Sequence, residues 1–370
     1  MNLSARPALF FSIPLLASVI GAGITFDLPP LYLEGLGWLV IIALVALCMD
    51  CLLQVTLPGR LELREALSPT ISEKFLGLGL GLLILAACVV DLIAFPLPLL
   101  KPAIYADFSN GRSYVRHISN MCWVLPVIGI LCTSRMSLRA IFIICSVVFP
   151  ILVLDRNRLF ASSYTLLVVM VVFLRAQLPW RRVILAVIGL LALFSQLGRL
   201  RSGNLDWISL PFSEFYSSLA PGMKWILLYI SSGAYNFSSI MAKGYRNDLF
   251  LVNQLVPGAG SVETLDSGIP LDDPVINIGT EYFPFLMAYG PIGAAVAALG
   301  LYFCLVASVM LLKRRPSLFT LLIFLRISYV CLMAGFAPQA YVWTNFGFVV
   351  LCVIVMLAIP VVQNLRPAKI

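Results

Sequence analysis

Charged side chains are scarce in this sequence, and their scarcity excludes an ordinary water-soluble domain. Lys, Arg, Asp and Glu make up 11% of the 370 residues, whereas soluble domains carry about 25%. Apolar residues make up 61%, which is more than a water-bounded core can hide, so lipid must be the solvent for much of the chain. Runs of about 20 apolar residues recur, and none shows the period-two alternation of an outer-membrane barrel. The sequence therefore predicts an all-α fold, a polytopic membrane helix bundle of about ten transmembrane helices.

Histidine is almost absent, which removes several classes of enzyme. His117 is the single histidine, so a multi-histidine zinc site is excluded and a Ser-His-Asp triad would depend on that residue alone. Neither a G-x-x-x-x-G-K-[ST] loop nor a G-x-G-x-x-G turn occurs, so nothing indicates a nucleotide-driven engine. We therefore expect no cofactor and no metal.

Nine cysteines are present, but all of them fall in apolar segments, where cysteine behaves as a small hydrophobe. The spacing of Cys48 and Cys51 resembles a redox motif, yet both lie inside a predicted span, which favours a structural role. The net charge of +8 is explained by membrane topology, so we expect no nucleic-acid partner.

Hydropathy predicts one transmembrane domain, residues 1–370, without internal repeats. The first apolar run lacks an A-x-A-like cleavage site and is followed by further spans, so we expect a retained helix rather than a signal peptide. The predicted spans are about 8–26, 36–57, 75–100, 119–134, 139–154, 159–175, 182–198, 281–312, 317–336 and 340–362.

Lysine and arginine are distributed unevenly between the loops, and this predicts the orientation. With the N-terminus inside, the cytoplasmic segments hold 14 basic residues and three acids, whereas the opposite side holds 10 basic residues and 12 acids. Short cytoplasmic loops carry an excess of Lys and Arg, so we expect both termini in the cytoplasm.

Residues 199–280 form the longest segment between spans, and we expect a large external region there with short amphipathic helices within it. Its stretch 223–242 is apolar enough to be mistaken for an eleventh span, but a crossing there would force Lys313, Arg314 and Arg315 outside. We expect this stretch to lie in the interface or to dip part-way into the membrane.

Arginine is out of place on the external side, where the charge bias disfavours it. Arg156 and Arg158 lie in a short turn between two spans, and Arg199 and Arg201 begin the large external region. Guanidinium forks bind phosphate oxygens two at a time, so four of them at neighbouring helix ends would form an anion site. The alternative is that each arginine reaches lipid phosphate or pairs with a nearby acid such as Asp155. For the cluster as a whole we favour the anion site.

Three charged residues lie inside predicted spans, where an isolated charge is costly: Asp50, Asp91 and Arg326. An ion pair between Arg326 and Asp91 is one expectation, with a structural role favoured over catalysis. The sequence leaves the partner open.

Motifs in the second half of the chain resemble a known family. Tyr229-Ile-Ser-Ser-Gly-Ala-Tyr-Asn236 precedes a proline-bearing loop, which is followed by Asn277-Ile-Gly-Thr-Glu-Tyr-Phe283 and Tyr289-Gly-Pro-Ile-Gly293. Their order and spacing, together with the turn Asp155-Arg-Asn-Arg158, resemble the Wzy family of O-antigen and oligosaccharide repeat-unit polymerases.

The resemblance implies a membrane glycosyltransferase of the lipid-linked, GT-C type that works on the periplasmic face of a bacterial inner membrane. It would transfer the growing glycan from undecaprenyl diphosphate onto the non-reducing end of a lipid-linked repeat unit. Undecaprenyl-diphosphate-linked oligosaccharides and membrane lipid would be its partners, and a chain-length regulator protein is a further candidate. Residues 199–280 would then be periplasmic.

The same resemblance, combined with the charge pattern, suggests roles for individual residues. Glu281 is the expected general base, with capping of the following helix as an equal alternative. Arg156 and Arg158 would complete the catalytic set by stabilising charge on the departing diphosphate. The expected diphosphate-binding residues are Arg199, Arg201 and Arg246, and the expected sugar-binding residues are Tyr229, Tyr235, Asn277 and Tyr282. Other external carboxylates stay open as the base: Glu214, Asp248, Glu263, Asp266, Asp272 and Asp273.

Three other functions compete with the polymerase. An O-antigen ligase, which moves glycan to lipid A core, is expected to carry a histidine in its large external loop, and residues 199–280 contain none. A lipid-linked oligosaccharide flippase or another transporter would be expected to show internal repeats and a site at the membrane midplane. The third alternative is a structural membrane subunit, in which the arginines are incidental.

Overall fold

The computed structural model describes residues 7–56, 68–101, 113–173, 180–202, 205, 208–256, 268–341 and 343–364. The described chain is α-helical apart from one isolated bridge between Phe26 and Phe212. The helices are α1 (Ala8–Thr25), α2 (Tyr32–Thr56), α3 (Ile71–Ala94), α4 (Ser113–Ser119), the 3-10 helix η3 (Asn120–Val124), α5 (Leu125–Leu131), α6 (Met136–Leu152), α7 (Arg156–Phe173), α8 (Trp180–Ser202), α9 (Glu214–Ser218), α10 (Pro221–Lys243), α11 (Asp248–Leu255), α12 (Phe283–Arg314), α13 (Leu318–Met333) and α14 (Trp343–Asn364).

Several of these helices are apolar enough to cross a membrane. Four of them, α1, α2, α3 and α12, also have the required length, and five shorter apolar helices cover residues 115–131, 136–152, 184–200, 318–333 and 344–359. The long apolar helices indicate a multi-pass membrane protein.

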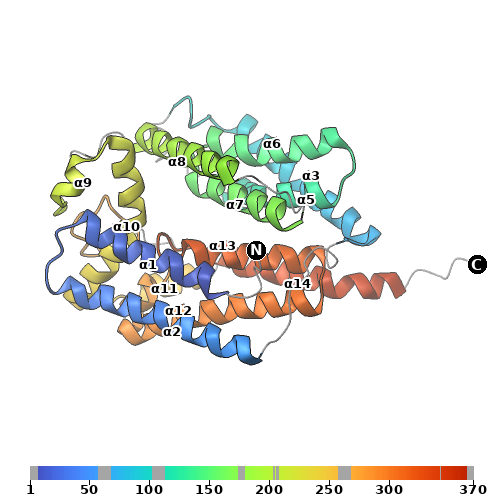
Figure 1. Ribbon diagram of the computed structural model, residues 1–370. Helices are drawn as coiled ribbons and strands as arrows, with labels where there is room; N and C mark the ends of the chain where they lie inside the picture. The colour runs from blue at the N-terminus through green and yellow to red at the C-terminus, as the bar shows by residue number, and fades with distance from the viewer. Residues whose placement is uncertain are drawn as a thin grey trace, which may run out of the picture.

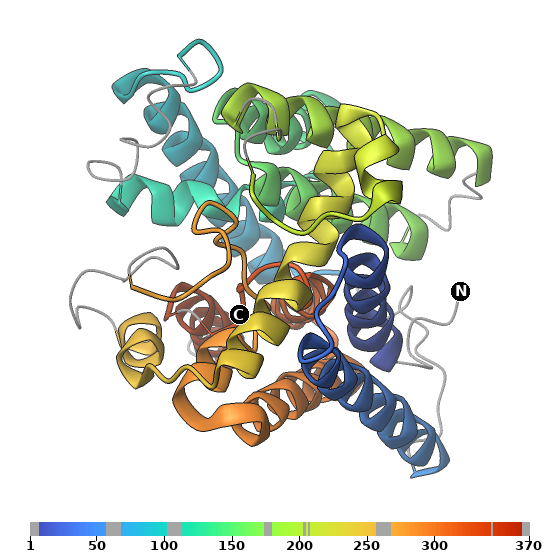
Figure 2. The same cartoon turned by 90° about the vertical axis from the view of Figure 1, so that its left-hand side faces the viewer.

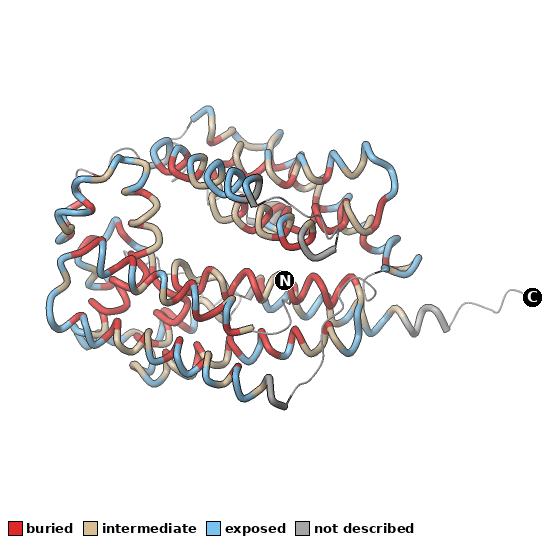
Figure 3. Tube along the Cα trace, viewed as in Figure 1, coloured by how far each residue is buried: buried red, intermediate tan, exposed pale blue. Residues whose placement is uncertain are grey.

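Large apolar side chains also cover the outside of the bundle. On α3, Phe75 is 77% exposed and Ile93 is 81% exposed. Figure 3 shows exposed positions on the outward sides of the helices and buried positions where the helices face one another. An extensive apolar exterior around a packed interior is what a lipid solvent requires.

Most of the helices form two groups, and the helix axes of both groups are roughly parallel (Figure 1). One group contains α3, α5, α6, α7 and α8, and the other contains α1, α2, α12, α13 and α14. At one end of the bundle, the start of α3 in the first group contacts the start of α13 in the second. Glu73 forms a capping box with Thr70 at the start of α3, and its Oε1 also accepts a hydrogen bond of 3.2 Å from the Leu318 N–H at the start of α13.

Asp50, one of the charges inside a predicted span, belongs to α2, and its side chain lies beside the start of α1. Its Oδ1 is 3.5 Å from the backbone nitrogen of Ala8, the first residue of α1, and 3.4 Å from the hydroxyl of Tyr302. A carboxylate is stabilised at the positive end of a helix dipole, so Asp50 has a structural explanation.

Helix α10 lies across the other end of the bundle, which we call the α10 end (Figure 2). It contacts the end of α1, where the Ser18 hydroxyl donates to Ile230 O at 2.8 Å. It also contacts the start of α2, where only glycine fits at position 35: a Cβ there would lie 2.6 Å from the Cα of Ser238. The stretch 223–242 is therefore part of one 23-residue helix that crosses the ends of the spans instead of running beside them.

Helix α12 is interrupted near its start. Gly290 has φ 73° and ψ −167°, a conformation that favours glycine, and Pro291 lacks an N–H to donate to the carbonyl of Met287. The residues after α10 supply the missing donors. The N–H of Asn247 donates to Met287 O at 3.0 Å, and Arg246 Nη1 donates to Leu286 O at 2.8 Å.

Candidate functional site

The arginines and the carboxylate predicted from the sequence lie at the α10 end, spread along the length of α10. Arg156 begins α7, Arg199 lies near the end of α8, Arg246 follows α10, and Glu281 precedes α12. The start of α7 and the end of α8 contact α10 through Trp225, which approaches both Arg156 and Gly198. Arg156 therefore lies beside the first turns of α10, whereas Arg246 follows its last turn, and the 23-residue helix separates them.

Arg156 is enclosed by aromatic rings from two other helices. Its guanidinium carbon lies 4.9 Å from the ring centroid of Phe194 on α8, and 5.7 Å and 5.6 Å from those of Trp225 and Tyr229 on α10. Gly198, one turn after Phe194, lets the guanidinium pack against the backbone of α8. Ring faces stabilise a cation at such distances, so the structure holds a positive charge at this point.

An apolar groove of about 540 Å³ begins next to this aromatic cage. It lies between α6, α7, α8 and α13, and Phe160, which lines it, contacts Phe194 of the cage with ring centroids 5.0 Å apart. Its other lining residues include Leu166, Met170, Leu190, Leu193 and Leu332. The groove can take a long apolar chain with the Arg156 cation at one end.

Arg158 lies in a different environment from Arg156, because residues two positions apart in a helix point about 200° from each other. It is 5% exposed, and its Nε forms an ion pair of 2.9 Å with Asp155. Its Nη1 donates to the Ser119 hydroxyl at 3.2 Å and lies 3.9 Å from the carboxylate of Asp91. Asp91 therefore pairs with Arg158, and it also accepts a hydrogen bond of 2.9 Å from the Ser119 hydroxyl. The expected pair between Asp91 and Arg326 is wrong, and Arg326 donates instead to the side chain of Asn345 at 2.5 Å.

Glu281 is buried, with 1% exposure, in the turn before α12. Its Oε2 accepts hydrogen bonds from the backbone N–H groups of Gln339 and Ala340, and its Oε1 accepts one of 2.9 Å from Tyr341. Burial raises the pKa of the Glu281 carboxyl, and the hydrogen bonds from the three N–H groups act against that shift. Glu281 does not cap α12, whose N-cap is Tyr282 without a side-chain bond. Its two oxygens hold the 339–341 turn instead.

We expect Glu281→Gln to destabilise the protein, because glutamine has one acceptor oxygen and would turn its NH₂ group toward an N–H donor. The loss of charged, buried hydrogen bonds is expected to lower the free energy of unfolding by about 3 kcal/mol. The melting temperature of the purified variant checks this, with the exposed Glu34→Gln as the matched control. Unchanged melting with loss of activity alone would instead identify Glu281 as a base.

The three other predicted diphosphate ligands differ in their surroundings. Arg199 is exposed on α8 and follows Gly198, against which Arg156 packs. Arg246 is engaged at the α12 interruption. Arg201 belongs to α8, and its side chain lies outside the described part of the structure.

Of the predicted sugar ligands, Tyr229 belongs to the Arg156 cage and Asn277 is exposed. Tyr235 and Tyr282 are buried in the core, with 1% and 0% exposure. Tyr235 donates to Asp272 at 2.7 Å, so its ring and its hydroxyl are both engaged within the fold.

Asp272 accepts two further hydrogen bonds, from Tyr32 at 2.8 Å and from Lys243 at 2.6 Å. Burial acts to raise the pKa of Asp272, but the hydrogen bonds from Lys243, Tyr235 and Tyr32 outweigh it and hold the pKa below its ordinary value. Asp273 accepts from the backbone N–H groups of Ser209 and Val275. Two other candidate bases, Glu263 and Asp266, lie outside the described residues.

The two segments that carry the family resemblance contact each other. The side-chain amide of Asn236, at the end of the first motif, donates to the carbonyls of Ile276 at 2.6 Å and Ile278 at 2.8 Å, which flank the start of the second. The spacing of the motifs thus corresponds to a packed unit at the α10 end.

The sequence did not indicate which side chains surround Arg156 and Arg326. Phe194 and Trp225 enclose Arg156, and Gln339 and Asn345 accompany Arg326. The sequence signal is weak, because an aromatic residue in an apolar helix is ordinary. One local signal is present: Phe194 and Gly198 are four residues apart on one face of a helix, directly before Arg199.

No protein-family model, no curated protein and no solved structure matches this chain. Among the described residues, no group of three His, Cys, Asp or Glu side chains is placed to hold a metal ion. Evidence for a function comes from the geometry of the α10 end and from the motifs.

Proposed function

We propose that this protein is a lipid-linked oligosaccharide repeat-unit polymerase, a glycosyltransferase that uses an undecaprenyl-diphosphate-linked donor. The observation that carries the proposal is the apolar groove that ends at the Arg156 cage. Its shape and charge suit a substrate with a long apolar chain and an anionic head. The type of reaction is inferred from the motif resemblance. The contact between the two motifs supports the interpretation that they form one site.

In the proposed reaction, the hydroxyl oxygen at the non-reducing end of a lipid-linked repeat unit attacks the anomeric carbon of the donor glycan. The bond from that carbon to the diphosphate oxygen breaks, undecaprenyl diphosphate leaves, and the hydroxyl proton passes to water or to a nearby base. The reaction consumes no nucleotide, because the sugar–diphosphate bond of the donor supplies the free energy.

Arg156 would stabilise the negative charge that builds on the leaving diphosphate, with Arg199 close by at the surface. Electrostatic stabilisation of this kind is worth about 2.7–4 kcal/mol per well-placed donor. Glu281 acts in this proposal as a positioning residue that holds the 339–341 turn, since both of its oxygens are engaged. Polymerisation of lipid-linked repeat units by the purified protein tests the proposal.

The proposed reaction requires the α10 end to face the periplasm. Reporters fused after Arg60, Arg181 and Arg315 are therefore expected to report cytoplasm, because these positions carry the excess of basic residues. Reporters near Asp107, Gly203 and Ser267 are expected to report the outside. Paired phosphatase and fluorescent-protein fusions check this, and a cytoplasmic signal at Ser267 would contradict the proposed face.

A further inference from the structure

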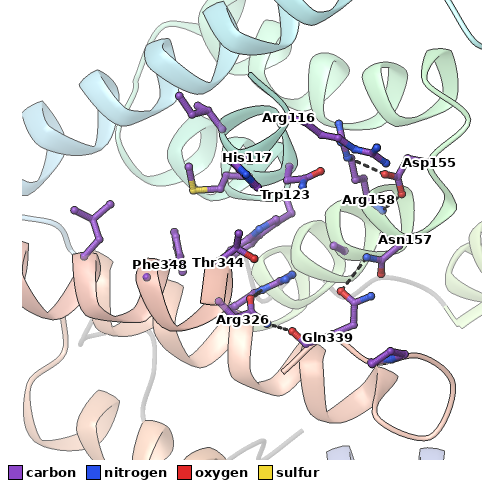
Figure 4. A pocket seen from close by; sticks show the side chains of 18 residues that line it. Arg116, His117, Trp123, Asp155, Asn157, Arg158, Arg326, Gln339, Thr344 and Phe348 are labelled. Atoms are coloured by element: carbon purple, nitrogen blue, oxygen red, sulfur yellow. Dashed lines mark hydrogen bonds and ion pairs between the residues drawn. The ribbon is translucent and has the colours of Figure 1, made fainter. Parts of the chain in front are cut away.

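A second cavity, of about 440 Å³, lies on the opposite side of α7 from the Arg156 cage (Figure 4). It is enclosed by α4 and η3, the start of α7, the middle of α13, the turn before α14 and the first turns of α14. This cavity and the apolar groove both border on α7 and α13, but no residue lines both of them.

Positive charge dominates the wall of this cavity. Three arginines line it, Arg116, Arg158 and Arg326, against one carboxylate, Asp155. Arg158 is paired with Asp155, and a second carboxylate, Asp91, lies 3.9 Å from it outside the lining. A third carboxylate, Glu281, acts on Arg326 from behind the wall, so the excess of arginine applies to the lining itself and not to the whole region.

Among the three arginines, Arg326 lies farthest from a helix end. It lies within the apolar helix α13, and its Nε donates to Asn345 Oδ1. Within the described part of the chain, no carboxylate lies within 4 Å of its guanidinium. The rings of Trp123 and Tyr329 face it, and the Glu281 carboxylate stabilises its charge from a longer distance. A cation in a low-dielectric interior is costly unless an anion accompanies it. In Figure 4 Arg326 and Arg158 stand on different walls of the cavity, so an anion between them would meet both charges.

The remaining wall is suited to a sugar. Asn157, Gln339 and Thr344 place amide and hydroxyl groups on the cavity, and Trp123 and Phe348 add aromatic surface. The side-chain amide of Asn157 donates to Gln339 at 2.9 Å, and its oxygen accepts from the Tyr329 hydroxyl, so these amides are held in place before a ligand arrives. Amides match sugar hydroxyl groups, and aromatic rings match the apolar face of a sugar.

We propose that this cavity binds an anionic sugar, a monosaccharide unit that carries a phosphate or a carboxylate, through Arg326, Arg116 and Arg158. The shared chemistry is an oxyanion that the guanidinium forks can grip, next to hydroxyl groups that the amides can meet. The glycan handled by the protein would then contain such a unit. This binding needs no turnover, so it does not depend on the polymerase proposal.

The test is isothermal titration calorimetry on the purified full-length protein in detergent, with glucose 1-phosphate, glucuronic acid and glucose as probes. We expect at least one anionic probe to bind and glucose to bind at least tenfold more weakly. Binding of glucose 1-phosphate alone identifies phosphate as the anion, and binding of glucuronic acid alone identifies a carboxylate. Failure of both anionic probes, or equal binding of glucose, overturns the proposal.

Variants connect the binding to the cavity. Arg326→Gln is expected to weaken the anionic probe by about tenfold or more, and Arg326→Lys by less, because lysine keeps the charge but loses the fork. Arg116→Gln, at a half-buried position, is the second variant in case Arg326→Gln does not fold. Arg135→Gln, exposed at the start of α6 at the other end of the bundle, is the matched control. Wild-type affinity in both Arg116→Gln and a folded Arg326 variant overturns the proposal.

A protein that polymerises repeat units but binds neither anionic probe would refute only this inference. One that binds them through Arg326 but does not polymerise would refute only the proposed function.

Discussion

Cells that lack this protein are expected to display lipid A core capped with a single repeat unit in place of long surface glycan. The repeat unit is still assembled, exported and ligated without the polymerase, but nothing joins one unit to the next. The length distribution of surface glycan on a gel checks this, and expression of the wild-type chain from a plasmid should restore the long chains. The expected change is qualitative, from a ladder to one band.

The same experiment separates the polymerase from the ligase. Loss of a ligase leaves bare core and long polymer still attached to its lipid carrier. A deletion strain with that pattern would refute the proposed function and establish the ligase alternative.

Replacement of Arg156 by alanine is expected to slow polymerisation by about 10²–10³-fold, because the guanidinium stabilises charge that develops on the leaving diphosphate. The position next to the groove and within the cage of Phe194, Trp225 and Tyr229 makes this arginine the best placed of the predicted cluster. Arg156→Lys should also be poor, because an ammonium keeps the charge but loses the two-pronged geometry. Turnover of lipid-linked repeat units by the purified variants is the measurement.

Arg135→Ala provides the matched control for Arg156, since it removes an exposed arginine from the other end of the bundle. Its turnover is expected to equal that of the wild type. Melting temperatures of both variants show whether a loss of activity reflects unfolding. A folded Arg156→Ala protein with wild-type turnover would show that this arginine has no part in the reaction.

Helix positions could be predicted from the sequence because long apolar runs and helix-end charges are local signals. The segments 139–154 and 182–198 correspond to α6, Met136–Leu152, and α8, Trp180–Ser202. The expectation that 223–242 does not run beside the spans also agrees with the position of α10 across the helix ends. Charge bias disfavours a crossing there, and charge bias is visible in the sequence.

Side-chain partners could not be predicted, because they depend on how each helix is rotated about its axis. The sequence placed Arg326 inside a span, as a possible partner for Asp91, and placed Arg158 in an external turn. Only the packed bundle shows that Arg158 lies 3.9 Å from Asp91. Glu281 illustrates the same limit. Its partners lie 58–60 positions later in a turn whose N–H groups face it, and nothing in the local sequence indicates that contact.

The most direct measurement is polymerisation by the purified wild-type chain, given undecaprenyl-diphosphate-linked repeat units and no nucleotide. The proposed function predicts glycans of two and more repeat units attached to one lipid, with release of one undecaprenyl diphosphate for each bond formed. Repeat units that stay single in the presence of folded protein would contradict it.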